Sequence, residues 1–287
     1  MGRVARVVLG LASLALAWGC VIGPPPLTPD APVQFERSIV FYGHPLVVHL
    51  VRPCALDAAH PLLLYATGDG GWRGKDLDTF RHLARWGYPL AGFSAPDYLK
   101  HLGDESDTTT PARLAEDYGQ LIAVTKDALG LPADTPTVLV GVSRGADLSV
   151  VAAGQRRLQP GLAGVLAVAL TREEEYVRHR RFRFRRRPTP AEVQAQEMVM
   201  VQLYEYLPQL GSLPISVIQS TNDNYLPADQ ARVLFGPDST YRQFHSIAAR
   251  DHSFGGARDE MYAEMKSSLT WIVQRMPGAA AGRTGER

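Results

Sequence analysis

The sequence predicts an α/β domain with a mainly parallel sheet and helices on both faces. Short apolar runs at residues 62–66, 137–142 and 162–170 are typical of strands that are buried on both sides. Amphipathic stretches such as residues 111–129 alternate with these runs, and their apolar side chains recur at helical spacing. Strands and helices that alternate in this way join parallel strands through right-handed crossovers.

The remaining elements are predicted from the same patterns. In chain order we expect a hairpin of strands 38–42 and 46–52, a helix over 77–84, a strand at 88–93, a helix from Gly145, a helix at 191–207, a strand at 215–219, a helix at 228–235, a strand at 241–247 and a closing helix at 259–276. Gly43-His44-Pro45 is expected to turn the hairpin, and Gly130 to end the helix over 111–129.

The composition excludes several classes of protein. The chain has 287 residues, of which 45% are hydrophobic and 21% charged, so it is neither disordered, collagen-like nor a multi-span membrane protein. Its 30 Lys and Arg nearly balance 29 Asp and Glu, which argues against nucleic acid as a partner. With only Cys20 and Cys54, a disulfide framework or a cysteine zinc cluster is excluded. We expect Cys54 to be a small buried side chain, with a Cys20–Cys54 disulfide as the alternative.

The first twenty residues have the pattern of an export signal. Two arginines precede an apolar run that is too short to span a bilayer comfortably. Gly19-Cys20 then resembles the lipidation site of bacterial lipoproteins, which would make Cys20 the lipidated N-terminus; the alternative is ordinary cleavage after Ala17. We therefore expect a periplasmic protein with a lipid anchor. The expected organisation is a signal at 1–20, a proline-rich linker at 21–33, the folded domain at 34–276 with an insertion at 171–210, and a loose tail at 277–287.

Gly141-Val142-Ser143-Arg144-Gly145 is a G-x-S-x-G motif between a predicted strand and a predicted helix. In that context the motif predicts a sharp turn that lifts the Ser143 hydroxyl clear of the backbone at a helix N-terminus, as a nucleophile requires. The alternative is a tight turn in which Ser143 only caps the helix.

A nucleophilic serine needs a basic histidine and a carboxylate that orients it, in the chain order Ser, acid, His. Asp223 follows the strand at 215–219, and His252 follows the strand at 241–247, so both are expected at the carboxyl edge of the sheet. The rival acids are Asp147, Asp229 and Asp251, and the rival histidine is His245. Two backbone N–H groups are expected to form the oxyanion hole: that of Arg144, and that of Asp69 or Gly70 in the glycine-rich loop after strand 62–66. This chemistry requires no metal and no cofactor.

Several motifs together resemble the VirJ/AcvB branch of the α/β-hydrolases, which are virulence-associated secreted bacterial proteins. They are Gly68-Asp69-Gly70-Gly71-Trp72, Asp97-Tyr98-Leu99, the helix start around Thr110-Pro111, the run from Gly141 to Asp147, and the loops of Asp223 and His252. The resemblance covers residues 61–273 but not the pattern of 171–210. It implies the triad Ser143, Asp223 and His252, and hydrolysis of aminoacylated phosphatidylglycerol, notably the lysyl form, on the periplasmic side.

Residues 178–187 are rich in arginine and lie in the expected insertion near the site. They would suit contact with anionic membrane lipids; a solvated loop is the alternative. Trp72, Glu174 and Arg181 are the candidate substrate-binding residues. The sequence leaves three functions open: a periplasmic ester hydrolase acting on a phospholipid or other ester, a general esterase or acyl transferase, and a non-catalytic envelope protein that binds a lipid or a protein partner.

Overall fold

The computed structural model describes the chain from residue 32 to residue 276, except for residues 42, 56–59, 103–109 and 177–198. These residues belong to one compact unit, Pro32–Arg287. The expectations for Cys20, Arg181 and the arginine-rich run at 178–187 lie outside the described residues, as do those for the export signal and the C-terminal tail.

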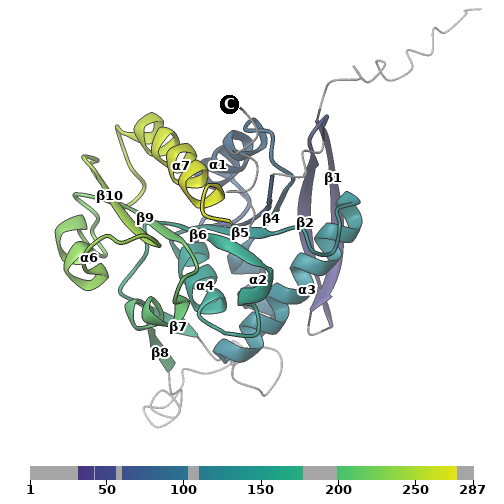
Figure 1. The fold of residues 1–287 in the computed structure, drawn as a ribbon, viewed down its shortest axis with the longest axis horizontal. Helices are drawn as coiled ribbons and strands as arrows, with labels where there is room; N and C mark the ends of the chain where they lie inside the picture. The colour runs from purple at the N-terminus through teal and green to yellow at the C-terminus, as the bar shows by residue number, and fades with distance from the viewer. Residues whose placement is uncertain (1–31, 42, 56–59, 103–109, 177–198, 277–287) are drawn as a thin grey trace, which may run out of the picture. The chain divides into compact units, whose positions relative to one another are not determined.

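An eight-stranded sheet forms the centre of the fold (Figure 1). In spatial order its strands are β1 (Val33–Phe41), β2 (His44–Arg52), β4 (Leu90–Phe93), β3 (Leu62–Ala66), β5 (Thr137–Val142), β6 (Leu162–Val168), β9 (Ile215–Ser220) and β10 (Arg242–Ile247). The six strands from β4 to β10 are parallel, and the β1–β2 hairpin joins their edge in antiparallel pairing. The loops that follow the parallel strands therefore all emerge at one edge of the sheet.

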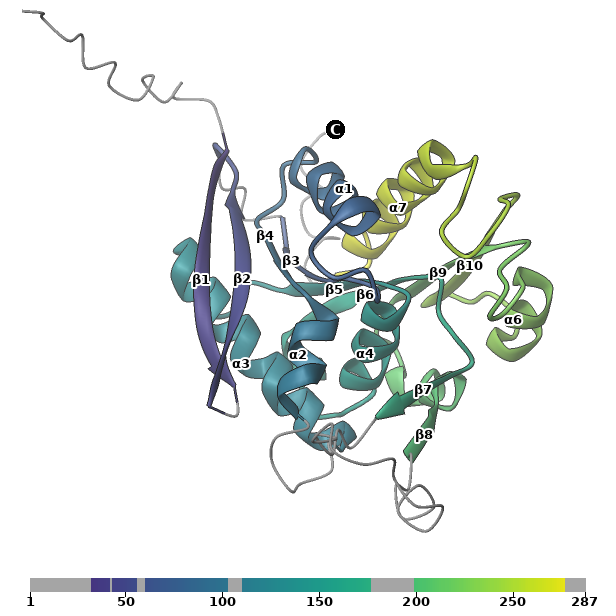
Figure 2. The ribbon, with the colours of Figure 1, turned by 180° about the vertical axis from the view of Figure 1, so that it is seen from behind.

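Helices cover both faces of this sheet (Figure 2). One hydrophobic cluster lies between the sheet and α2 (Ala95–Leu102), α3 (Pro111–Leu129) and α4 (Arg144–Ala153), and extends to α6 (Ala228–Phe235). A second cluster lies on the opposite face, under α1 (Gly74–Ala84) and α7 (Arg258–Val273). Two buried faces explain why the inner strands are apolar along their whole length rather than at alternate positions.

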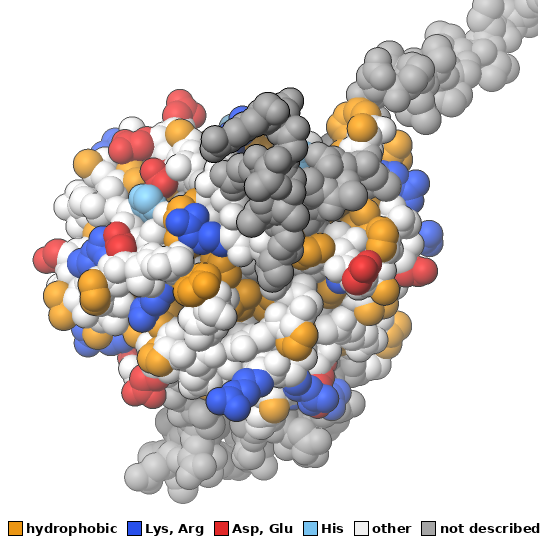
Figure 3. All heavy atoms as spheres, viewed as in Figure 1, with side chains coloured by type: hydrophobic (Ala, Val, Ile, Leu, Met, Phe, Trp, Pro, Cys, Tyr) orange, Lys and Arg blue, Asp and Glu red, His pale blue; other side chains and the backbone are white. Residues whose placement is uncertain are grey.

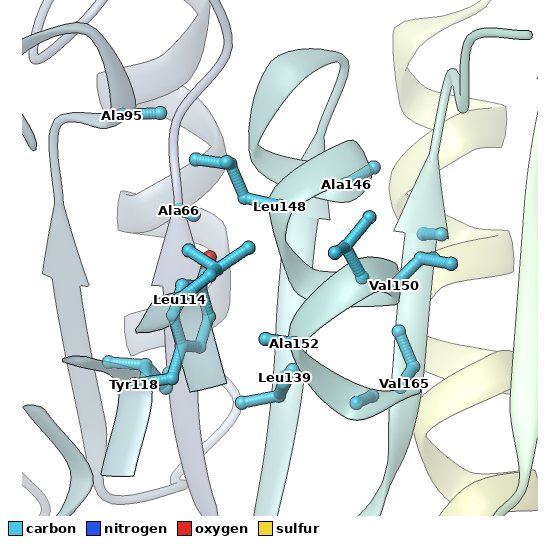
Figure 4. Close-up of a cluster of buried hydrophobic side chains, with 14 of the residues drawn as sticks. Ala66, Ala95, Leu114, Tyr118, Leu139, Ala146, Leu148, Val150, Ala152 and Val165 are labelled. Atoms are coloured by element: carbon cyan, nitrogen blue, oxygen red, sulfur yellow. The ribbon is translucent and has the colours of Figure 1, made fainter. Parts of the chain in front are cut away.

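Helix α4 is the most deeply packed of these helices, and it follows the candidate nucleophile directly. All of its residues from Gly145 to Ala153 are buried. Figure 4 shows Leu148 on the side of α4 that faces Leu114 of α3, and Val150 on the opposite side, towards Val165 of β6. The start of α4 is consequently held in place by packing along its whole length.

Local signals explain the elements whose bounds match the prediction. Helix α3 starts where the Thr110 hydroxyl accepts the backbone N–H of Arg113 at 3.2 Å, and Pro111 occupies its first turn. It ends at Gly130, whose φ of +69° lies in the left-handed region that glycine adopts readily. The predicted strands 62–66 and 137–142 and the predicted helices 111–129 and 228–235 are confirmed with the same bounds.

The insertion differs from the prediction. In place of the end of a helix at 191–207, the described part contains strand β8 (Val199–Gln202), which pairs antiparallel with β7 (Glu173–Tyr176). Two short 3₁₀ turns follow, Leu203–Tyr206 and Pro208–Leu210. The β-branched valines of β8 favour a strand, and β7 supplies the pairing partner that the local pattern did not reveal.

Two further differences concern short-range features. Helix α2 was not predicted; it begins after Ser94, whose hydroxyl accepts the N–H of Asp97 at 3.3 Å. The expectation for Cys54 is wrong, because the side chain is exposed in the turn after β2.

The face of the molecule in Figure 3 is not dominated by either sign of charge. On the face shown in Figure 3, acidic and basic side chains of the described residues are interspersed. Within the described ranges, no helix is both long enough and apolar enough to cross a membrane.

Candidate active site

Ser143 stands at a strained turn between β5 and α4. Its φ is +52° and its ψ is −124°, values that side-chain-bearing residues rarely adopt. Its N–H donates to the carbonyl of Val168 at 2.8 Å. A Cβ on Gly145 would lie 2.1 Å from the carbonyl oxygen of Ala66, and one on Gly141 would lie 2.2 Å from the Gly145 carbonyl, so only glycine fits at both positions. The hydroxyl makes no capping hydrogen bond, which argues against the helix-cap alternative.

The structure brings Ser143, His252 and Asp223 together from loops that are far apart in the chain. The Ser143 Oγ lies 2.8 Å from His252 Nε2, and His252 Nδ1 lies 2.6 Å from Asp223 Oδ2. Because a carboxylate only accepts hydrogen bonds, the proton of the neutral imidazole belongs on Nδ1. Nε2 is then free to accept the hydrogen of the serine hydroxyl, as a general base must.

Asp223 is held by donors on both of its oxygens. Gln219 Nε2 donates to Oδ2 at 2.9 Å, while the backbone N–H groups of Tyr225 and Leu226 donate to Oδ1 at 2.8 and 3.3 Å. The residue is only 1% exposed. These donors fix the orientation of the carboxylate, so that Oδ2 faces His252.

The rival residues have other partners. Asp147 accepts from Thr171, Asp229 from the backbone N–H of Gln230, and Asp251 from the N–H groups of Ser253 and Gly255 in its own loop. His245 Nδ1 lies 3.2 Å from Glu264 Oε1. The hydrogen bonds from Gly255 and Ser253 also lower the pKa of Asp251. None of these contacts joins the rivals to Ser143.

The glycine-rich loop after β3 lies against the nucleophile. A Cβ on Gly68 would be 3.4 Å from the Cβ of Ser143. Gly71 donates its N–H to the Gly68 carbonyl at 3.1 Å. Among the described residues, the N–H groups of Asp69, Gly70 and Arg144 form no hydrogen bond. The expected oxyanion donors are thus available beside Ser143.

Asp76 holds this loop through a hydrogen bond to its backbone. The residue carries no motif that marks it in the sequence. Its Oδ1 accepts the backbone N–H of Gly68 at 2.8 Å and the hydroxyl of Tyr65 at 3.1 Å. Burial raises the pKa of Asp76 above its ordinary value, against the hydrogen bonds that lower it. In the sequence Asp76 looks like an ordinary carboxylate in the first turn of a helix, so only its position next to the loop reveals the contact.

Two cavities flank Ser143. A cavity of about 420 Å³ contains Ser143, His252 and apolar side chains such as Phe254 and Met261. A second, of about 560 Å³, lies on the other side; its charged lining comprises Asp69, Arg144, Arg172, Glu173 and Glu174. Tyr225 lines both cavities; it is 67% exposed and meets the His252 ring edge-on, with centroids 4.7 Å apart. Sequence reasoning missed Tyr225, which carries no motif of its own.

Of the predicted substrate-binding residues Trp72 and Glu174, only Glu174 lines one of these two cavities. Trp72 lines neither cavity: its indole stacks on His49, with centroids 3.8 Å apart, and packs against Phe80, so its role in substrate binding stays a prediction. Glu174 does line the second cavity, but it is buried and ion-paired with Arg144. Within the described ranges, no three histidine, cysteine or acidic side chains gather as a metal site would require.

The parallel sheet, the nucleophile turn and the loop order define the class of this protein as an α/β-hydrolase fold. Solved structures show the same fold. Est1E from Butyrivibrio proteoclasticus aligns with a TM-score of 0.58 at 11% identity, covering 83% of this chain and 98% of that one. A putative dienelactone hydrolase from Klebsiella pneumoniae aligns with a TM-score of 0.59 at 15% identity, covering 85% and 100%. A cold-adapted esterase from an Arctic intertidal metagenomic library gives 0.55 at 13% identity, covering 85% and 94%. The predicted fold class is confirmed.

Within this fold, the chain carries the sequence pattern of the family described as bacterial virulence protein (VirJ), which it matches over residues 61–176. The predicted resemblance is confirmed for that range, which includes the glycine-rich loop after β3 and Ser143 but ends before the loops of Asp223 and His252. A comparison with curated proteins found no match.

Proposed function

We propose that this protein is a serine hydrolase that cleaves a carboxylic ester through an acyl-enzyme. The observation that carries the proposal is the continuous chain of hydrogen bonds from Ser143 Oγ through His252 to Asp223, at 2.8 and 2.6 Å. The strained serine turn and the free N–H groups of Arg144 and Asp69 or Gly70 support it.

The geometry suggests a specific role for each residue. His252 Nε2 takes the proton of the Ser143 hydroxyl as Oγ attacks the ester carbonyl. The N–H groups of Arg144 and of Asp69 or Gly70 stabilise the oxyanion, and the Asp223 carboxylate stabilises the imidazolium. His252 then gives its proton to the departing alcohol. In the second half, His252 activates a water that attacks the acyl carbon and releases the acid, which restores the serine.

Turnover of p-nitrophenyl butyrate by the wild type and by Ser143→Ala tests this function. We expect the substitution to lower kcat by at least about a thousandfold, because the nucleophile is lost. A fluorophosphonate probe should label the wild type at Ser143. Equal turnover by the two proteins, or an unlabelled and inactive wild type, would refute the hydrolase and favour a binding protein on the same scaffold.

For the substrate, we propose the aminoacyl ester of a phospholipid, in particular lysyl-phosphatidylglycerol. The VirJ match over residues 61–176 and the acidic groups of the second cavity support this choice. Glu173 is exposed there, and its Oε2 accepts only the amide of Gln202 at 2.8 Å among the described contacts, so it is the carboxylate best placed to receive a substrate ammonium. Glu174 is committed to Arg144.

Vesicles that contain lysyl-phosphatidylglycerol test the substrate. Lysine release by the wild type but not by Ser143→Ala would support the proposal, and Glu173→Gln should raise KM for this lipid while leaving KM for p-nitrophenyl butyrate unchanged. Turnover of the p-nitrophenyl ester without any lysine release would instead indicate a general esterase or acyl transferase.

For the location, we propose export to the periplasm and anchoring through a lipid on Cys20, with residues 178–187 lying against anionic lipids. The signal pattern of residues 1–20 supports the first part. Labelled palmitate should enter the wild-type protein in cells but not Cys20→Ser. Equal labelling, or none in either protein, would leave cleavage after Ala17 as the better interpretation.

A further inference from the structure

The side chain of Arg144 connects two segments that meet only at the candidate site. Its Nε lies 2.9 Å from Asp69 Oδ1, as an ion pair without hydrogen-bond alignment. Its Nη2 lies 3.2 Å from Glu174 Oε1. Asp69 belongs to the oxyanion loop and Glu174 to strand β7 of the insertion. Arg144 thus ties the loop to the insertion across the start of α4.

The two ends of this link differ in how firmly they are held. The Asp69 side chain is 63% exposed, whereas that of Glu174 is 8% exposed. A buried carboxylate on a paired strand has little freedom to move, and an exposed one has much more. Glu174 is therefore the fixed end, and it sets where the guanidinium of Arg144 lies.

Glu174 is also a neighbour of Asp147. Its carboxyl group lies close enough to Asp147 to disfavour the charged form of the Asp147 carboxyl group. Asp147 is fully buried in α4, and Thr171 donates its N–H to Asp147 Oδ1 at 3.1 Å. Burial and the neighbouring Glu174 raise the pKa of Asp147 well above its usual range. Glu174 thus lies between buried Asp147 and the guanidinium of Arg144.

In this arrangement Glu174 influences the expected oxyanion hole without touching the reacting atoms. One expected donor is the N–H of Arg144, and the other is that of Asp69 or of its neighbour Gly70. Arg144 and Asp69 are the two partners of one ion pair. We propose that Glu174 is a positioning residue: by holding the Arg144 side chain it keeps the nucleophile turn and the oxyanion loop at the spacing that the transition state needs. This inference rests on the proposed esterase function and assigns Glu174 a role other than substrate binding.

A neutral ester separates positioning from binding. p-Nitrophenyl acetate has no cationic group, so a loss of its turnover has to come from the catalytic geometry. Glu174→Gln keeps the size of the side chain but removes its charge from Arg144. We expect kcat to fall by about tenfold, less than the loss of a whole oxyanion donor, with KM within about twofold of the wild type. The matched control is Glu260→Gln, which neutralises an exposed carboxylate on α7 and should leave both constants unchanged.

Arg144→Met tests whether Glu174 acts through the guanidinium. Its backbone N–H is retained and its side chain is one-third exposed, so the variant should fold even where the buried Glu174→Gln does not. We expect Arg144→Met to lower kcat by about as much as Glu174→Gln does. In the Arg144→Met variant, adding Glu174→Gln should lower kcat by less than a further factor of about two.

Two results would overturn the inference: wild-type kcat in the folded Arg144→Met variant, or fully multiplicative losses in the double variant. A wild type that turns over the ester no faster than Ser143→Ala would refute the proposed function itself, and the positioning role with it. An active wild type with an unaffected Arg144→Met would refute the positioning role alone.

Discussion

The substitution Asp223→Asn offers a sharp test of how the candidate triad works. Asp223 accepts four hydrogen bonds: His252 and Gln219 donate to Oδ2, and two backbone N–H groups donate to Oδ1. Asparagine has one acceptor oxygen and one NH₂ group, so either orientation turns an accepting position into a donor. The residue is almost fully buried, and water does not relieve the conflict.

The two orientations differ in cost. With the NH₂ towards the backbone, two N–H groups lose their acceptor. With the NH₂ towards His252, the imidazole can change tautomer so that Nδ1 accepts, and only Gln219 lacks an acceptor; its amide is also held by the Leu226 carbonyl at 2.7 Å. Each buried donor without a partner costs about 1–3 kcal/mol, so the second orientation is favoured. In that tautomer Nε2 carries a proton and does not accept one from Ser143. We therefore expect a thousandfold to ten-thousandfold fall in kcat, about 4 to 5.5 kcal/mol in activation free energy.

The assay is kcat for p-nitrophenyl butyrate, with thermal unfolding to show that the variant folds. Its free energy of unfolding should fall by only about 1–3 kcal/mol, the cost of one unpaired donor. Asp229→Asn, which changes an exposed carboxylate at the start of α6, is the matched control and should keep wild-type activity. A folded Asp223→Asn protein with more than a tenth of the wild-type kcat would refute the assigned role of the tautomer.

Three further predictions concern the surroundings of the site. Gly145→Ala should prevent folding or lower the melting temperature by many degrees, because its Cβ would lie 2.1 Å from a β3 carbonyl oxygen. The control Gly161→Ala, which has open space around the new Cβ, should melt like the wild type. Equal melting temperatures of the two variants would contradict this packing. Asp147→Asn should flatten the pH dependence of the free energy of unfolding. Because the pKa of Asp147 is raised, the wild-type carboxyl group contributes stability at low pH, and this contribution is lost as the pH rises through that pKa, by at most about 1.4 kcal/mol per pH unit. Urea unfolding from pH 4 to 8 measures the free energy of unfolding, and parallel pH curves for the two proteins would contradict the prediction. Asp76→Ala should lower kcat for p-nitrophenyl acetate by about tenfold or more, since the loop loses the acceptor of the Gly68 N–H; unchanged kcat would show that the loop keeps its shape without it.

The candidate triad was predictable because each residue has a local sequence signal and because the parallel sheet brings the three loops to one edge. Ser143 sits in a five-residue motif, and Asp223 and His252 each follow a strand. Parallel strands bring their carboxyl ends to one edge, so the position of each loop along the chain already implied that the three residues meet. Helix α3 was equally clear, since Thr110 and Gly130 mark its ends within its own sequence.

The surroundings of other residues near the site depend on distant neighbours. Trp72 belongs to the glycine-rich loop, and its indole stacks on His49 from another strand. Glu174 is one of three consecutive acidic residues, and in the fold it is buried and paired with Arg144. Asp76 gave the pattern of a helix start, and only the fold places it under Gly68.

The sequence by itself determined the strands and helices outside α2 and the insertion, the turn at Ser143 and the edge of the sheet where the candidate site lies, because periodicity, capping residues and glycines act over a few positions. Tertiary structure alone decided which acidic side chains are buried, which charged groups lie next to each other and which residue holds the glycine-rich loop after β3. Those properties depend on the solvent and the charges around each group, and segments far apart in the chain supply both.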